Sequence, residues 1–167
     1  SRQLEEVTFR RTVIPVQELL DAAGKYFKKL MKNRPERIEL EIESMEAKVI
    51  GDVNQLRFLL ENLIDEALTV REDGVIRLQA RKDNEYIRFL FTDTRREKSV
   101  EELNQLFYPN LARMTSGEKG ELRGTEYLVC KQIIRDHDEF AGRRGCRINA
   151  EPAEGGGFTV YFTIPRR

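Results

Sequence analysis

The stretch DVNQLRFLLENLIDEALTVR, from Asp52 to Arg71, carries the clearest structural signal in this chain of 167 residues. Its apolar residues recur every three or four positions, which places them in one stripe along a helix. They are Leu56, Leu59, Leu60, Leu63, Ile64, Ala67 and Leu68. Asp52 is of a residue type that caps helix N-termini, and Asp73-Gly74 ends the segment. The stretch therefore predicts an amphipathic helix that packs on a core.

On the N-terminal side, short alternating and helical patterns predict four elements before this helix. They are a strand from Glu6 to Val13, a helix from about Pro15 to Asn33, a strand from Ile38 to Ile42, and a short strand from Ala47 to Ile50. Pro15 suits the first turn of a helix. Asn33-Arg34-Pro35 would end it.

On the C-terminal side, two hairpins and two helices are predicted. The first hairpin has strands from Val75 to Arg81 and from Tyr86 to Phe91, joined at Asp83-Asn84. The helices are a short one from Ser99 to Leu106 and a longer one from Arg123 to His137. The second hairpin has strands from Cys146 to Ala150 and from Phe158 to Ile164, joined through Glu154 to Gly157. Hairpins beside helices indicate an α/β two-layer sandwich, with a mixed and mainly antiparallel sheet on about three helices. The length predicts a single domain over residues 1–167.

The composition argues against some classes of function, namely nucleic-acid binding and membrane spanning. Hydrophobic residues make up 40% of the chain and charged residues 35%, with 29 basic and 29 acidic side chains. A balanced charge gives no reason to expect nucleic acid as a partner, and no apolar run is long enough for a membrane span. Cys130 and Cys146 form no metal-like pair, so we expect a reducing, cytoplasmic setting. A parent protein could still be anchored in a membrane by another segment. Cys130 lies in an apolar run and is expected in the core.

Three motifs follow one another at informative spacing. They are Gly51-Asp52 with Asn62-Leu63-Ile64-Asp65-Glu66-Ala67, then Asp93-Thr94-Arg95-Arg96-Glu97, then Gly124-Thr125-Glu126-Tyr127. Phe107 precedes the third motif, and a Gly-rich turn with a closing strand follows it over residues 155–165. This ordered set resembles the ATP-binding domain of sensor histidine kinases, in the group that includes gyrase, Hsp90 and MutL. The resemblance covers about Val7 to the end. It implies a Bergerat-type fold, with ATP and Mg²⁺ as the family's ligands.

Carried over residue by residue, the resemblance assigns four positions to the nucleotide site: Asn62, Glu66, Asp93 and Gly124. Glu66 stands where the family has the Asn that ligates Mg²⁺, and a carboxylate is also a suitable Mg²⁺ ligand. Asp93 matches the residue that accepts a hydrogen bond from adenine. Gly124 matches a glycine at the start of the phosphate-binding helix. Alternatively, Glu66 is a polar helix flank and Asp93 an ordinary turn former.

Other positions depart from the family pattern. Arg95 and Glu97 replace two glycines after Asp93, where side chains would fill the space over adenine and ribose. Glu126 replaces the second glycine of the last motif, and Thr69 replaces a phosphate-binding Lys. A carboxylate roughly 4 Å from a phosphate charge costs on the order of 4 kcal/mol at an effective dielectric near 20. A micromolar ligand is held by about 8 kcal/mol in all. Two such carboxylates would therefore cancel ordinary ATP affinity.

We therefore predict a degenerate ATP-binding domain related to histidine kinases of two-component systems. It would lack a cofactor and act through a signalling partner, such as a response regulator, a kinase or upstream segments of its own chain. No Ser or Cys is paired with a His base, so no catalytic residue is assigned. The alternatives are an active, divergent domain that binds ATP and Mg²⁺ and transfers phosphate to a His on another domain, and a binder of some other small molecule.

Three further features have competing interpretations. His137, the only histidine, is expected to be a helix-terminal residue favoured by the helix dipole rather than a phosphoacceptor. The segment from Asp138 to Gly145, with Arg143-Arg144, is either a docking loop or a solvated charged loop. Gly117 and Gly120 suggest a lid, although such loops also occur without ligands.

Overall fold

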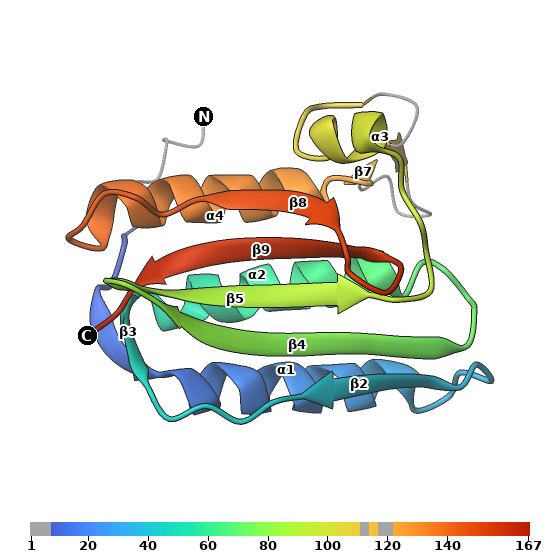
Figure 1. Cartoon of the computed structure of the whole chain (residues 1–167), viewed down its shortest axis with the longest axis horizontal. Coiled ribbons are helices and arrows are strands. Elements are labelled where there is room, and N and C mark those ends of the chain that lie inside the picture. Colours follow the sequence, from blue (N-terminus) through green and yellow to red (C-terminus); the bar gives the residue numbers. More distant parts are fainter. Residues whose placement is uncertain (1–7, 111–113, 117–121) are drawn as a thin grey trace.

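This computed structural model describes residues 8–110, 114–116 and 122–167. Its main sheet has five strands in the order β2-β4-β5-β9-β8, with bounds Ile38–Ile42, Gly74–Asp83, Tyr86–Asp93, Phe158–Pro165 and Ile148–Pro152. Three long helices lie behind the sheet in Figure 1: α1 (Val16–Met31), α2 (Val53–Ala67) and α4 (Glu126–Phe140). Gly117, Gly120 and the beginning of the first predicted strand lie outside the described residues.

Strand pairing makes the sheet mixed. β2 runs parallel to β4, whereas β4–β5, β5–β9 and β9–β8 are antiparallel pairs. Pairing between Asp83 and Tyr86 leaves a two-residue turn in which Asn84 has a φ of 54°. The helices and the sheet enclose one hydrophobic core. The predicted two-layer α/β fold, mainly antiparallel, is confirmed.

The predicted apolar stripe faces this core. All seven of its residues on and just after α2 are at most 4% exposed. Asp52 caps the helix, since its Oδ1 accepts a hydrogen bond from Gln55 N at 3.1 Å. Burial of a Leu or Ile side chain contributes roughly 1.5–3 kcal/mol, so the stripe fixes α2 against the sheet. Cys130 of α4 is also buried here, as predicted.

The first strand lies later than predicted. β1 spans Thr12–Pro15 and pairs with β3 (Lys48–Gly51) in a separate two-stranded sheet. Before it, Arg10 N donates to Asp52 Oδ2 and the Phe9 ring packs edge-on against His137. The predicted strand therefore overlaps β1 only at Thr12 and Val13, whereas Phe9 and Arg10 contact α4 and the capping residue of α2.

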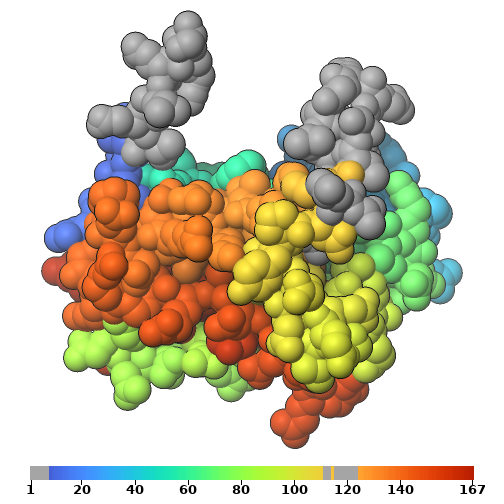
Figure 2. Space-filling model, turned by 90° about the horizontal axis from the view of Figure 1, so that it is seen from above, coloured from blue at the N-terminus to red at the C-terminus, as the bar shows by residue number. Residues whose placement is uncertain are grey.

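The elements near the C-terminus also differ in their bounds. Leu122–Arg123 forms β7, paired with β6 (Thr115–Ser116), so α4 begins at Glu126, and it continues to Phe140, beyond His137. β8 begins at Ile148 rather than Cys146, because Asp138 Oδ1 holds the amides of Gly145 and Cys146 in a turn. The short helix α3 (Val100–Asn104) is capped by Ser99. Figure 2 shows the α3 segment, in yellow, against the orange surface of α4 and β8.

Candidate functional site

The predicted site residues lie at one end of the molecule, around the last turn of α2 and the end of β5. Asn62, Glu66 and Asp93 are all buried, with 7%, 8% and 2% of their surface exposed. Glu66 and Asp93 are brought together through Arg96, whose Nη2 is 3.7 Å from Glu66 Oε2 and whose Nε is 3.6 Å from Asp93 Oδ2. Asn62 Nδ2 donates back to Phe58 O within its own helix at 2.8 Å. Gly124 precedes α4 with a φ of 80°, a conformation that glycine adopts without strain.

Both oxygens of Asp93 are bound by Arg95. Asp93 Oδ1 accepts from the backbone N and the Nε of Arg95, each at 2.9 Å, and Asp93 Oδ2 accepts from Arg95 Nη2 at 2.9 Å. The two side chains are only 2% and 1% exposed. A bidentate guanidinium–carboxylate pair is among the stronger charged contacts in proteins. The carboxylate expected to receive adenine is thus engaged by a residue two positions further on.

The remaining donors of the Arg95 guanidinium close the end of α2. Its Nη1 donates to the carbonyl oxygens of Val70 at 3.0 Å and Glu72 at 2.9 Å, and its Nη2 donates to that of Ala67 at 2.7 Å. A guanidinium has five N–H donors, and all five are used here. Arg95 consequently ties the end of α2 to the end of β5, with no unsatisfied group of its own.

Gly74 makes room for this side chain. It has a φ of 141°, and a Cβ atom at this position would lie 2.6 Å from Arg95 Cγ. Atoms that close would have to move, so any larger residue would displace Arg95 or the start of β4. The absence of a side chain at position 74 and the buried arginine at position 95 are therefore structurally linked.

Arg96 and Glu97 have different environments. Arg96 lies 5.6 Å from the ring centroid of Phe158, and its Nε and Nη2 are buried without a hydrogen bond among the described residues, so its carboxylate contacts are ionic. Glu97 turns toward the β8–β9 connection, where its Oε2 accepts from Gly157 N at 2.7 Å. Of the two side chains that replace glycines, Arg95 therefore turns toward Asp93, whereas Glu97 supports a turn.

Two further carboxylates, Glu126 of α4 and Asp65 of α2, lie close enough to influence each other. Glu126, in the first turn of α4, has a buried Oε1 that finds no hydrogen-bond partner in the described part of the chain. Burial, together with the charge of Glu126, raises the pKa of Asp65, which accepts a hydrogen bond from the Tyr26 hydroxyl at 2.6 Å. Burial and the same bond raise the pKa of Tyr26. The charges of Glu126 and Asp65 therefore act on each other, and a phosphate group placed beside them would be repelled.

His137 lies in the last turn of α4, as the sequence suggested, but the helix dipole does not stabilise a charged form of its ring. It is fully buried, and burial lowers its pKa, whereas a helix C-terminus alone would raise it. Its Nε2 accepts from Asp52 N at 3.1 Å, so Nδ1 carries the proton and donates to Ile133 O at 2.8 Å. A Cβ on Gly51 would lie 2.8 Å from the ring. His137 and Gly51 therefore hold the start of α2 against α4.

The charged loop after α4 folds onto itself and its neighbours. Arg143 Nη2 pairs with Glu85 Oε1 at 3.1 Å, and Arg144 Nε lies 3.6 Å from Asp138 Oδ2. The Tyr86 hydroxyl donates to Arg144 O.

At the site around Asp93, the sequence did not indicate the roles of Gly74 and Arg96. Only the Asp-x-Arg spacing could have signalled the Asp93–Arg95 pair.

Comparison with known proteins identifies the family. Residues 51–167 match the family described as "Histidine kinase-, DNA gyrase B-, and HSP90-like ATPase". The chain belongs to this family. No curated protein matches it significantly in sequence. In the described part of this ATPase-family chain, no helix is long and apolar enough to cross a membrane.

Solved structures of histidine kinases share the fold. The catalytic domain of histidine kinase ThkA, free of nucleotide, is 21% identical with a TM-score of 0.71, and the match covers 94% of this chain and 97% of that one. The mycobacterial sensor histidine kinase MprB is 19% identical with a TM-score of 0.71, over 95% and 99% of the two chains. ThkA in complex with the response regulator TrrA is 19% identical with a TM-score of 0.72, over 98% and 44%.

Proposed function

We propose that this chain is a single domain of the histidine kinase-like ATPase family in which the chain's own arginine takes the place of nucleotide. Its role would be to bind a signalling protein in the cytoplasm. The observation that carries the proposal is the buried Asp93–Arg95 pair, in which all five guanidinium donors are satisfied. For adenine to reach Asp93, this pair would have to open.

The cost of opening supports the proposal. Breaking a buried ion pair costs about 3–5 kcal/mol. Since each 1.4 kcal/mol is a tenfold change in affinity, ATP affinity would fall by roughly two to four powers of ten from that step alone. The buried Oε1 of Glu126, which has no hydrogen-bond partner among the described residues, adds repulsion toward phosphate. A micromolar dissociation constant would thus rise to roughly 0.1–10 mM from opening the pair, and further with the repulsion from Glu126.

A signalling partner is favoured by family membership and fold. The histidine kinase ThkA has been solved with its response regulator TrrA, and the fold of that kinase matches nearly all of this chain. With ATP hydrolysis absent, a surface for such a partner is the activity that the fold can still supply. We propose a response regulator or another kinase as the partner class.

The second candidate is an active, divergent domain that binds ATP and Mg²⁺. It is favoured by the positive φ of Gly124 and by the position of Glu66 on α2, where a carboxylate can ligate Mg²⁺. In this alternative, Asn62, Glu66, Asp93 and Gly124 form the nucleotide site, with Glu66 as the metal ligand.

Isothermal titration of Mg–ATP into the wild type and into Asp93→Asn separates the two. The proposed function predicts no saturable heat up to millimolar ATP with either protein. The active alternative predicts micromolar binding by the wild type that weakens markedly in Asp93→Asn. Circular dichroism at the same temperature verifies that the variant is folded, and Thr94→Ser, next to the site, serves as the matched control. Micromolar wild-type affinity would refute the proposed function.

A further inference from the structure

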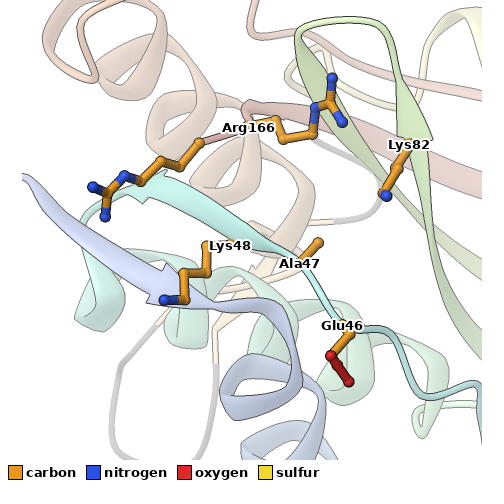
Figure 3. A pocket seen from close by; sticks show the side chains of 6 residues that line it. Glu46, Ala47, Lys48, Lys82 and Arg166 are labelled. Carbon is orange, nitrogen blue, oxygen red and sulfur yellow. The ribbon is translucent and has the colours of Figure 1, made fainter.

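A cluster of four basic side chains lies at the opposite end of the sheet from Asp93. Lys48, Lys82, Arg166 and Arg167, here called the basic cluster, line an open cavity of about 530 Å³ with Glu46 and Ala47 (Figure 3). β5 begins near this cluster, because Arg166 N donates to Glu85 O just before the first residue of the strand. The same strand ends at Asp93. Eight residues of strand separate the two ends by roughly 23 Å at 3.3 Å per residue.

The basic cluster is not neutralised. Among the described residues, no ion pair joins any of its four side chains to an acid, although arginines elsewhere pair with Glu36, Glu41, Asp83, Glu85, Asp93 and Asp138. The nearby acids Asp83 and Glu85 are taken by Arg88 and Arg143. Glu46 is the one acidic side chain in the lining, and Figure 3 shows it directed away from Lys82 and Arg166. In a chain of zero net charge, this is a local excess of positive charge.

The backbone under these side chains is held firmly. Arg167 N donates to Lys48 O at 3.0 Å, and Val49 forms a bridge with Arg166 that joins β3 to the end of β9. Lys82 is paired with Ile87 in the β4–β5 hairpin. The four charges thus project from a fixed base that is formed by three separate segments of the chain.

The backbone bonds also limit what the cluster can recognise. A compact phosphate is usually cradled by free backbone N–H groups. Here the amides of Arg166 and Arg167 already donate to Glu85 O and Lys48 O. What remains are long side chains spread around an open cavity, three of the four residues being exposed. Such an arrangement suits several carboxylates spaced along a protein segment better than one phosphate group.

We propose that the basic cluster docks an acidic segment of a partner protein. The proposal adds a partner chemistry to the protein-binding role given above, but it does not depend on whether Asp93 can receive nucleotide. Complementary charges mainly accelerate encounter and set orientation. Exposed charges are screened over about 10 Å at 0.1 M salt, so the contact should weaken strongly as salt rises.

Fluorescence anisotropy with a fluorescein-labelled octaglutamate peptide tests the proposal. We expect saturable binding to the wild type at 50 mM NaCl that weakens at least tenfold at 300 mM. The variant Lys48→Gln/Lys82→Gln/Arg166→Gln/Arg167→Gln should lose at least tenfold in affinity. The matched control, Lys25→Gln/Lys28→Gln/Lys29→Gln/Lys32→Gln, removes four exposed charges from α1 and its end and should stay within twofold of the wild type.

Several outcomes would overturn this proposal. Absence of peptide binding would mean that the cluster does not recognise acidic segments. Equal losses in the cluster variant and the α1 control would mean that only total charge matters. Displacement of the peptide by 10 mM inorganic phosphate, beyond the effect of chloride at equal ionic strength, would indicate a phosphate site instead. Cluster-dependent binding to vesicles containing phosphatidylserine, without peptide binding, would indicate a lipid surface.

The test is separable from that of the proposed function. Mg–ATP is an anion and could itself bind the basic cluster weakly. Titrating it into the cluster variant removes that contribution, so any remaining affinity reports the Asp93 region alone. Such affinity would refute the proposal that Arg95 blocks nucleotide at Asp93, but it would not affect the proposal that the basic cluster docks an acidic segment.

Discussion

The two ends of the central sheet use arginine in opposite ways. At the Asp93 end, Arg95 is 1% exposed and has all its donors satisfied by one carboxylate and three carbonyl groups. At the other end, Arg166 and Arg167 line an open cavity without an acidic partner among the described residues. The difference teaches that burial and pairing, not residue type, decide whether a basic side chain stabilises the fold or remains available to a ligand.

The largest expected effect comes from Arg95→Ala. It leaves the buried Asp93 carboxylate without its bidentate partner and frees three carbonyl groups at the end of α2, so we expect a loss of about 3–5 kcal/mol in the free energy of unfolding. Arg77→Ala is the control, because Arg77 and Glu41 form an exposed pair with side chains 47% and 55% exposed. Its cost should be about 1 kcal/mol or less. Urea titrations of both variants measure this difference, and equal costs would contradict the account.

Gly74→Ala tests whether the buried position of Arg95 depends on the space beside its side chain. A Cβ there meets Arg95 Cγ at 2.6 Å, whereas a Cβ on Gly155, also at positive φ, meets nothing within 4 Å. Gly155→Ala should cost about 1–2 kcal/mol from backbone strain alone. We expect Gly74→Ala to cost roughly 1–3 kcal/mol more, the range for overpacking. Thermal unfolding of the two variants provides the comparison, and similar melting temperatures would argue against a fixed Arg95.

His137 provides a pH test at the end of the sheet where α2 begins. Burial lowers its pKa, so the unfolded chain binds a proton more readily than the folded one. Stability should therefore be complete above the unfolded pKa of about 6.5 and fall as pH drops below it. Because the chain has one histidine, His137→Gln should flatten the dependence between about pH 7 and 5.5 while lowering stability throughout. Denaturant titrations across this range that showed the same slope in both proteins would contradict the assignment.

The smallest expected effect is on the stability of the basic cluster variant. Its four side chains make no ion pair with a described residue, so their replacement by Gln should change the free energy of unfolding by about 0.5 kcal/mol or less for each substitution. Urea titration in the absence of peptide measures this. A loss comparable with that of Arg95→Ala would mean that the cluster is structural, and the contrast between the two ends would disappear.

Local patterns made much of the fold predictable. The α2 stripe, the two hairpins and the cap at Asp52 follow from spacing and turn residues close in sequence, and each is present. The first strand was placed too early, because Phe9 and Arg10 owe their positions to α4 and Asp52 rather than to a neighbouring strand. Tertiary contacts of this kind leave no periodic trace in the sequence.

The site was predicted in outline only. Sequence reasoning expected Arg95 and Glu97 to occupy ligand space, but the direction of each side chain depends on where α2 and the β8–β9 turn lie. The neutral, buried state of His137 was likewise hidden, because Asp52 is 85 positions away in sequence. The nucleotide roles of Asn62, Glu66, Asp93 and Gly124 stay predictions until a ligand is tested.

The central claim is that Arg95 holds Asp93 in place of adenine, and the Nε–H signal of Arg95 reports on it most directly. This proton is buried in a hydrogen bond to Asp93 Oδ1. We predict that, in nitrogen-15 NMR spectra, its resonance is sharp and neither shifts nor loses intensity when Mg–ATP is added to several millimolar. A saturable shift of this resonance, or its loss through exchange with solvent as ATP binds, would contradict the account.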